Sequence, residues 1–231
     1  MHLRVMTYNI QGHAASRRPD HIPKIAETIK AIAPDVVGLQ EVHCRTRQSQ
    51  SIDQASQLAE LTGLNLHFGR SCAMEGGDYG NAVLTRGTIA EGRAHPLPGS
   101  GEPRSLLESK IDIDGMRITF FVTHLAAWGR LLRNARLSQI AKLGDITGAG
   151  HSPHLLVGDF NVPPAAEELR VLLSHGHLKM CGDTKEPTFP ATRQRLDYIF
   201  CDEKWDLVDQ EIVRRGPSDH WPIVAHFKLR D

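Results

Sequence analysis

A large charge imbalance is absent from this 231-residue sequence, because 27 Lys and Arg are balanced by 27 Asp and Glu. Without a basic field over the whole surface, attraction to nucleic acid or to an anionic membrane has to come from local clusters of charge. Aromatic residues are also scarce, with 7 Phe, 3 Tyr and 3 Trp, so stacking platforms for single-stranded nucleic acid are not evident. Both shortages argue against a protein whose main task is to grip nucleic acid.

Cysteines are few, and none forms a Cys-x-x-Cys pair: they stand at Cys44, Cys72, Cys181 and Cys201. This spacing argues against a thiolate zinc site or a dithiol redox motif, and we expect isolated, reduced thiols. Met1 leads directly into a strand-like segment without the basic and apolar regions of a secretory leader. No run approaches the roughly 20 apolar residues that span a bilayer. We therefore expect a cytoplasmic protein without an integral membrane segment.

Strand-like and helix-like segments alternate along the chain. About 40% of the residues are apolar, which at this length predicts a sizeable core, and we expect one domain over residues 1–231 and a monomer. Helices are predicted at 21–33, 54–61 and 130–146, with another after Pro164. Strands are predicted at 3–9, 36–41, 65–69, 81–86, 104–113, 116–124, 155–161, 195–201, 205–213 and 221–229. The dipeptide Asp114-Gly115 predicts a hairpin that makes two of these strands antiparallel neighbours. This pattern alone indicates a mixed α/β fold.

Polar side chains of unusual type follow the apolar run Leu155–Gly158. Alternation along a strand places Leu155, Val157, Asp159 and Asn161 on one face, so a carboxylate continues a row that is otherwise core. A buried carboxylate is costly unless something compensates it. The plain alternative is a turn at the end of the strand, since Asp and Asn are common there.

The same arrangement recurs at other strand ends, which favours a site over a turn. Asn9, Glu41 and His124 each terminate an alternating apolar row. Asp197 and the pair Asp219-His220 adjoin further strand-like segments. Ser218-Asp219-His220 cannot form a serine protease triad, because adjacent residues of an extended segment point to opposite faces.

This ordered set of motifs resembles the endonuclease/exonuclease/phosphatase superfamily, the group of DNase I, exonuclease III, sphingomyelinases and inositol polyphosphate 5-phosphatases. The resemblance covers residues 5 to 226. It rests on Thr7-Tyr8-Asn9, Leu39-Gln40-Glu41-Val42, Thr123-His124-Leu125, Gly158-Asp159-Phe160-Asn161, Leu196-Asp197-Tyr198-Ile199 and Ser218-Asp219-His220. It implies a four-layer αββα sandwich, with two mixed sheets face to face and helices outside. It also implies a metal-dependent hydrolase of phosphate esters.

A metal ion is the first element of the implied site. Hard divalent cations such as Mg²⁺ or Mn²⁺ prefer oxygen ligands and keep several waters, so one or two carboxylates and an amide suffice. We expect Glu41 as the first ligand with Asn9 beside it, and the resemblance implies Asp219 as an outer or second ligand.

The resemblance also assigns roles in catalysis. It implies that Asp159 orients or deprotonates the attacking water and that Asn161 holds the transition state. It implies that His220, paired with Asp197, contacts the phosphate, as does His124. Whether Asp159 or His220 is the general base stays open, because the spacing permits either.

Arginines gather in the loops that adjoin the predicted site residues, most of them after such a residue and two of them before Asp197. They are Arg17, Arg18, Arg45, Arg47, Arg130, Arg133, Arg193 and Arg195. Such a rim would focus a phosphorylated substrate into the site, and the alternative is ordinary solvated loop charge. We select Arg45 and Arg130 as phosphate contacts, together with Asn81 and Arg104 from the family's middle motifs.

The substrate is the least determined property. A phosphorylated small molecule, a lipid headgroup and nucleic acid all remain open, and the zero net charge favours a general phosphodiesterase or phosphomonoesterase. The alternatives are a repair-type DNA endonuclease or exonuclease and a non-catalytic binding protein on the same fold. The last should lack Asp159, Asn161 or His220, and all three are present.

Overall fold

Two six-stranded sheets form the centre of the structure, a computed structural model that describes residues 1–127, 129–150 and 153–230. The first sheet has the order β11-β12-β1-β2-β4-β3, and the second has the order β5-β6-β7-β8-β10-β9. The first contains β1 (His2–Asn9), β2 (Val36–Cys44), β3 (Asn65–Met74), β4 (Gly77–Thr85), β11 (Trp205–Ile212) and β12 (Ile223–Leu229). The second contains β5 (Thr88–Leu97), β6 (Arg104–Ile113), β7 (Met116–His124), β8 (His154–Asp159), β9 (Lys179–Met180) and β10 (Asp197–Cys201).

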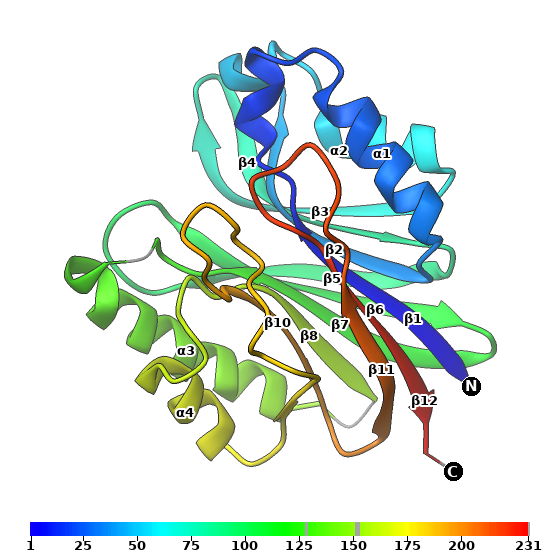
Figure 1. Ribbon diagram of the computed structural model, residues 1–231, viewed down its shortest axis with the longest axis vertical. Coiled ribbons are helices and arrows are strands. Elements are labelled where there is room, and N and C mark those ends of the chain that lie inside the picture. Colours follow the sequence, from blue (N-terminus) through cyan, green and yellow to red (C-terminus); the bar gives the residue numbers. More distant parts are fainter. Residues whose placement is uncertain (128, 151–152, 231) are drawn as a thin grey trace.

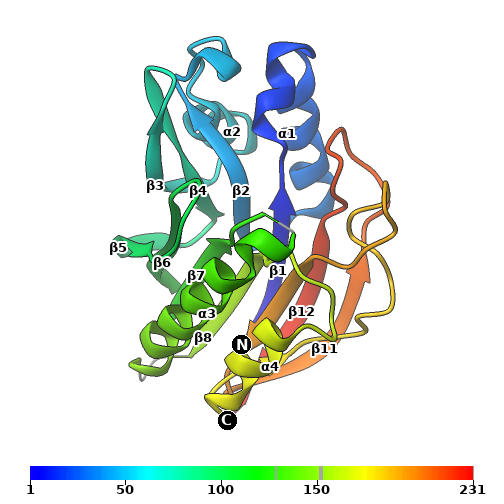
Figure 2. The same ribbon diagram turned by 90° about the vertical axis from the view of Figure 1, so that its left-hand side faces the viewer.

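Helices cover the outer face of each sheet. They are α1 (His21–Ile32), α2 (Gln54–Thr62), α3 (Arg133–Gly148) and α4 (Glu167–Ser174), with short 3-10 helices η1 (Gly12–Ser16), η2 (Arg47–Ser49) and η3 (Arg130–Leu132). Figures 1 and 2 show α1 and α2 together on one side of the molecule and α3 and α4 together on the other. Within the described residues, no helix is long and apolar enough to cross a membrane.

Three apolar layers hold this stack together. Between the sheets, Val5 and Val36 of the first sheet join the cluster of Phe120 and Val157 of the second. A second cluster joins the first sheet to α1 and α2, and a third joins the second sheet to α3 and α4. The expected four-layer αββα sandwich is therefore confirmed. Each sheet buries apolar side chains on both faces, which requires strands richer in Val, Ile and Leu than half-exposed strands.

Helix α1 illustrates how the sequence specifies an outer layer. Ile22, Ile25 and Ile29 recur at helical spacing and are almost completely buried against the first sheet. The helix ends where Ala33 adopts a left-handed conformation (φ 51°) before Pro34, which cannot continue a helix. The predicted range 21–33 is thus confirmed to within one residue. The carboxylate of Asp20 pairs with Lys24 and makes no capping hydrogen bond.

Some predicted elements were missing or displaced. Strand β5 was not predicted, because it is a mostly exposed edge strand that lacks an apolar row. The two-residue β9 is too short for a pattern. The predicted helix at 130–146 is split, since η3 precedes an α-helix that begins at Arg133. Strand β8 ends at Asp159, so Asn161 does not continue its row as expected.

The sheets approach closely beneath the polar strand ends. At Gly38 of β2, a Cβ atom would lie 2.4 Å from Cγ2 of Val157 and 2.8 Å from Cγ2 of Val122. Only a residue without a side chain lets the two sheets meet at this distance. Strands β1 and β2 run parallel, as do β7 and β8. The carboxyl ends of these two pairs carry the polar residues predicted from the sequence.

Candidate active site

A buried cluster of two carboxylates and an imidazole lies at the carboxyl end of β8. Asp159 is paired directly with Asp197 across antiparallel β8 and β10. The loop between β11 and β12 brings His220 to both, with Nδ1 2.8 Å from Oδ2 of Asp197 and Nε2 3.7 Å from Oδ2 of Asp159. Among the described residues, this is the group of three His, Cys, Asp or Glu side chains close enough together to hold a metal ion.

The charges of this cluster are set by its burial. Burial by itself would lower the pKa of His220, but the carboxylates of Asp197 and Asp159 outweigh it and raise that pKa to about 10. His220 is therefore an imidazolium at neutral pH. Burial, and then the charge of Asp197, raise the pKa of Asp159 towards neutrality. A carboxylate whose pKa lies near the working pH is suited to accept a proton.

The amide of Asn9 connects this cluster to Glu41 of the first sheet. Its Nδ2 donates to Oε1 of Glu41 at 3.0 Å and to Oδ2 of Asp159 at 3.1 Å. Burial would raise the pKa of Glu41, but contacts with His13, the nearby His124 and the Asn9 amide lower it to about 2. Glu41 is thus an ionised carboxylate at the junction of the two sheets. This donor set is the hard-oxygen type that Mg²⁺ or Mn²⁺ requires.

Left-handed backbone places two of these side chains. Glu41 has φ 59° and Asn161 has φ 55°; asparagine adopts this region more readily than most residues, whereas glutamate is strained there. Glu41 lies where a register shift interrupts the pairing of β2 with β4 between Leu39 and Val42. The backbone N–H of Asn161 donates to Oδ1 of Asp159 at 2.9 Å, and its Nδ2 donates to the Leu125 carbonyl at 3.1 Å. Such strain is concentrated at functional sites.

His124 lies at the end of β7, next to the end of β8 that carries Asp159. It is in register with Asp159, and its Nε2 lies 3.6 Å from Oδ2 of that residue. Burial and the neighbouring Arg104 guanidinium lower the pKa of His124 well below its usual value. Unlike His220, His124 is therefore neutral at pH 7. Its Nδ1 has no hydrogen-bond partner among the described residues.

The predicted phosphate contacts Arg104 and Asn81 are both buried. Arg104 pairs with Glu102 at 3.0 Å, but its Nε and Nη1 have no hydrogen-bond partner within the described part of the chain. A buried guanidinium with unused donors is suited to take an anion. Asn81 instead donates to the carbonyl of Ser105 at 3.2 Å, which makes it a support of the β6 strand beside Arg104.

Asp219 is held at the site by residues that follow Asn9. Nε2 of Gln11 donates to Oδ2 of Asp219 at 2.8 Å, and Arg18 donates to Oε1 of Gln11 at 3.1 Å. Ser218 donates to the backbone carbonyl of Asn9 at 2.7 Å. This chain of contacts fastens the β11–β12 loop to η1. Burial raises the pKa of Asp219.

Three of the eight rim arginines face acidic partners. Arg45 faces Asp53 at 3.7 Å, Arg47 faces Glu75 at 3.5 Å, and Arg133 pairs with Glu167. Arg195 is buried, and its Nε donates to the backbone carbonyl of Asp197 at 2.8 Å. It is therefore a structural support of β10. The side chain of Arg130 lies outside the part of the chain that the structure describes.

Four neighbours of the cluster were missed by sequence reasoning. Gln11 and His13 lie within four residues of Asn9, and Nδ1 of His13 is 3.5 Å from Oε2 of Glu41. Oγ1 of Thr188 accepts hydrogen bonds from the backbone N–H of Asp197, and the ring of Phe189 packs 4.9 Å from that of His220. The position of Gln11 and His13 just after a site residue was a usable signal. Thr188 and Phe189 had none, because they belong to a loop without periodicity.

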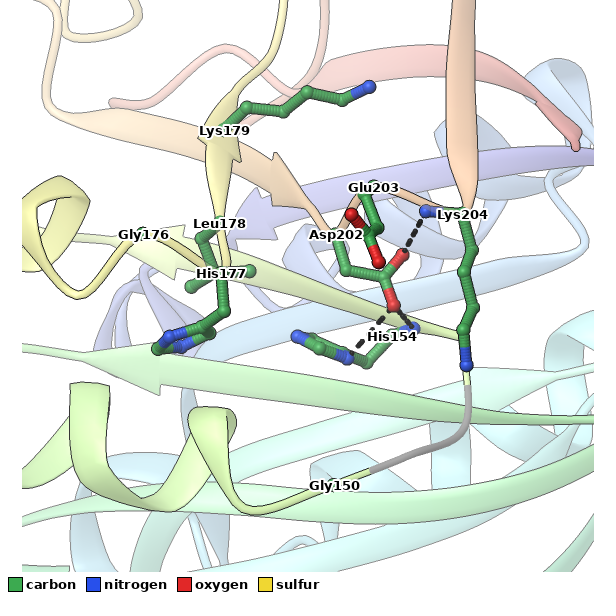
Figure 3. A pocket seen from close by; sticks show the side chains of 9 residues that line it. All are labelled: Gly150, His154, Gly176, His177, Leu178, Lys179, Asp202, Glu203 and Lys204. Carbon is green, nitrogen blue, oxygen red and sulfur yellow. Dashed lines mark hydrogen bonds and ion pairs between the residues drawn. The ribbon is translucent and has the colours of Figure 1, made fainter.

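A hollow of about 450 Å³ lies at the other end of β8 (Figure 3). His154 opens the strand that Asp159 closes, and its Nδ1 pairs with Oδ2 of Asp202 at 3.1 Å. His177 and Lys179 lie on the opposite wall of this hollow. The paired strand ends and the buried acids lie at the Asp159 end, so we assign the candidate active site there.

The four-layer α/β sandwich carries a buried cluster of two acids and an imidazole at its strand ends, and comparison with known proteins gives the family. A profile of the Endonuclease/Exonuclease/phosphatase family matches residues 6–220. The chain therefore belongs to this family, whose members are hydrolases that act on phosphoesters.

Three proteins illustrate the similarity of this chain to known sequences and structures. The protein YbhP of Escherichia coli (strain K12), described as uncharacterized, is 28% identical over 170 residues, 68% of this chain and 66% of YbhP. A family member from Beutenbergia cavernae is 28% identical, with a TM-score of 0.78 over 99% of this chain and 72% of that one. A mannosyl-6-phosphatase from Bacteroides thetaiotaomicron is 22% identical, with a TM-score of 0.77 over 98% of this chain and 100% of that one. At 22% identity, the last likeness shows the fold alone.

Proposed function

We propose that this protein is a divalent-metal-dependent hydrolase that cleaves a small phosphate ester by attack of water at phosphorus. The observation that carries the proposal is the meeting of Asp159 and a protonated His220 beside the ionised Glu41. A base, an acid and an anionic metal ligand are the groups that hydrolysis of a phosphate ester requires.

Glu41 and Asn9 would hold the metal ion, and Asp219 would contact it directly or through water. Their oxygen atoms are hard ligands and suit Mg²⁺ or Mn²⁺ better than a soft metal. When bound, such an ion polarises a phosphoryl oxygen and stabilises charge on the leaving oxygen.

Asp159 is the general base of this proposal. Its raised pKa lets it take a proton from water near neutral pH, and the Asn9 amide and the Asn161 N–H fix the orientation of its carboxylate. His220 is the less suitable base, because Asp197 keeps it protonated. As an imidazolium it would instead donate a hydrogen bond to a phosphate oxygen.

Neutral His124 and the side chain of Asn161 would contact the other phosphate oxygens. Asn161 is held in place by its hydrogen bond to the Leu125 carbonyl. The unused donors of Arg104 would bind a further anionic group of the substrate. Preorganised donors of this kind stabilise a transition state because they need no reorientation during the reaction.

A small substrate is favoured over a polymer by the state of the arginine rim. Arg45, Arg47 and Arg133 face acids of this chain, and Arg195 is buried. Half of the eight rim arginines are therefore engaged within the chain and are less available to successive phosphates of a nucleic acid.

A panel assay tests this proposal. Sugar phosphates, simple phosphodiesters, phospholipids and nicked or abasic duplex DNA would be incubated with the protein in Mg²⁺, Mn²⁺ or EDTA. We expect release of phosphate or alcohol from a small ester, its loss in EDTA, and its loss in Asp159→Asn. Hydrolysis that survives EDTA, or preference for duplex DNA over every small ester, would contradict the proposal.

A further inference from the structure

Two cysteines that are 20 positions apart in the sequence lie side by side in the core. Cys181 follows β9 and Cys201 ends β10, and their Sγ atoms are 3.2 Å apart. Both side chains are buried, with exposed fractions of 4% and 0%. The expectation of four isolated thiols was therefore wrong for this pair.

The backbone brings the two thiols to the same face of the second sheet. Register pairs Lys179 with Cys201 and Met180 with Phe200, and the N–H of Cys181 donates to the Ile199 carbonyl at 2.9 Å. Cys181 thus extends the ladder by one residue and lies diagonally across from Cys201. Both belong to the apolar cluster between the two sheets, and apart from Cys201 the Sγ atom of Cys181 contacts the Lys179 carbonyl at 3.7 Å.

We propose that Cys181 and Cys201 are a disulfide-forming site that a peroxide oxidises. A disulfide has an S–S distance of about 2.05 Å, so the two Sγ atoms need to approach by about 1.2 Å in total. That movement is small for Cys181, because it leaves a two-residue edge strand and precedes the exposed, left-handed Gly182 (φ 72°). Because the two Sγ atoms are already near van der Waals contact, the strand that carries Cys201 does not have to move.

The chemistry balances with hydrogen peroxide as the only co-reactant. One thiolate attacks a peroxide oxygen, the O–O bond breaks, and a sulfenic acid and hydroxide form. The second thiolate attacks that sulfur and displaces its hydroxide, which forms the S–S bond. The two thiol protons leave with the two hydroxides as water, and the two electrons lost by sulfur reduce the peroxide. Because both thiols are buried, we expect oxidant to enter when the β9 edge opens locally.

The bond would close the loop that supports the candidate active site. Between the two cysteines lie Thr188, which accepts from the backbone of Asp197, and Phe189, which packs on His220. Closing a loop of about 20 residues restricts the unfolded chain, and for a protein of this size we expect Tm to rise by about 5 to 10 °C. This inference does not depend on the proposed catalytic activity.

Mass spectrometry tests the site on the full-length protein. Reduced protein is treated with hydrogen peroxide, quenched with catalase, unfolded and alkylated with iodoacetamide. We expect two thiols to be alkylated where the reduced protein shows four, a mass lower by about 2 Da before alkylation, and a linked peptide pair containing residues 181 and 201. Reduction with dithiothreitol should restore four alkylated thiols and the lower Tm.

Matched variants separate this pair from ordinary thiol oxidation. Cys181→Ser and Cys201→Ser should each lose the linkage and the Tm rise, while Cys44→Ser and Cys72→Ser, at half-buried thiols elsewhere, should keep both. If the serine variants do not fold, detection of the linked peptide pair in the wild-type protein still decides whether the disulfide forms. Four alkylatable thiols after peroxide, oxidation of 181 or 201 to sulfinic acid without linkage, or a link through 44 or 72 would each overturn the inference.

Discussion

The imidazole of His220 donates from Nδ1 to Oδ2 of Asp197 at 2.8 Å, which turns its other nitrogen towards Asp159. This contact fixes both the orientation and the charge of the ring. Asp159 belongs to β8 and Asp197 to β10, so three separate segments of the chain must fold before the cluster exists. The two carboxylates and the imidazolium therefore act as one unit.

Loss of either partner of this unit should abolish most turnover. We predict that Asp159→Asn and His220→Ala fold normally and each lose on the order of 10² to 10⁴ in kcat, the usual cost of removing an acid-base or charge-stabilising group. The double variant should lose much less than the product of the single effects, because residues that act together are not additive. Steady-state kinetics on the substrate found in the panel assay, with circular dichroism as the folding check, measures both effects. Multiplicative losses would show that the two residues act independently.

The affinity for a divalent metal ion should depend on the Glu41 carboxylate. Its carboxylate is held ionised at the junction of the sheets, and oxygen ligands select hard cations. We predict that calorimetric titration of Mg²⁺ or Mn²⁺ shows clearly weaker binding in Glu41→Ala than in wild type. Asp53→Ala is a suitable control, because Asp53 caps α2 and lies outside the cluster. Equal affinity in wild type and Glu41→Ala would remove Glu41 from the metal site.

The left-handed backbone at Glu41 predicts an unusual order of stability. At φ 59° a residue with a Cβ atom pays about 1 to 2 kcal/mol of conformational strain, whereas glycine, which has no Cβ, does not. Glu41→Gly should therefore be more stable than Glu41→Ala by about 1 kcal/mol in urea denaturation, even after the entropy cost of glycine. The neighbouring Gln40 is a matched control with ordinary φ, and there the glycine variant should be the less stable one. The same order at both positions would argue against strain at Glu41.

Alternation along strands predicted which residues meet, but not how they are presented. Asn9 and His124 end their strands as the pattern required, while β8 ends at Asp159, two residues before the predicted end. The bulge at Glu41 was not predictable, because a Glu side chain does not by itself demand a positive φ. At Asn161 the sequence offered a turn as the alternative to a site, and the hydrogen bond from the Asn161 N–H to Oδ1 of Asp159 shows that the turn and the cluster occur together.

The charge states of the site histidines could not be predicted from the sequence either. His124 and His220 are both buried histidines, yet one is neutral and the other is protonated. The difference lies in their partners, since the guanidinium of Arg104 lies near His124 and the carboxylate of Asp197 bonds to His220. Only the folded chain brings those partners together, and this is why the choice of general base stayed open.

The free energy of unfolding should fall in mild acid, because His21 becomes protonated more readily in the unfolded chain. The ring is completely buried at the start of α1, its Nε2 lies 2.6 Å from the Ile10 carbonyl, and burial lowers its pKa below 6.5. Below about pH 6.5 the unfolded chain therefore binds this proton before the folded protein does, so protonation favours unfolding. The contribution is present above pH 6.5 and is lost as the pH falls.

Urea denaturation at pH 7.5, 6.5 and 5.5 measures this effect. We predict that wild type loses more stability over this range than His21→Gln, whose amide can still donate to the Ile10 carbonyl but does not titrate. His2→Gln is the control, because His2 is exposed, and it should behave as wild type. Parallel curves for wild type and His21→Gln would mean that His21 does not contribute to the pH dependence.

The salt dependence of DNA binding distinguishes a small substrate from a polymer. Each phosphate that a protein neutralises on duplex DNA adds about −0.9 to the slope of log affinity against log salt concentration. Arg45, Arg47 and Arg133 already face acids of this chain, so we predict a slope that corresponds to about three or fewer phosphate contacts. Fluorescence anisotropy of labelled duplex DNA between about 50 and 200 mM salt measures it.

The same arginines should influence capture of a small substrate more than its conversion. Replacing Arg45 and Arg47 with Ala should raise KM modestly and leave kcat nearly intact, because exposed rim charges act before the transition state. Arg117→Ala is the control, since Arg117 pairs with Asp112 beside the β6–β7 hairpin, at the opposite end of β7 from His124. It should change neither constant. A loss of DNA affinity of about 10³-fold or more over the salt range would correspond to six or more phosphate contacts. The rim would then serve a nucleic acid, and the small-substrate proposal would have to be abandoned.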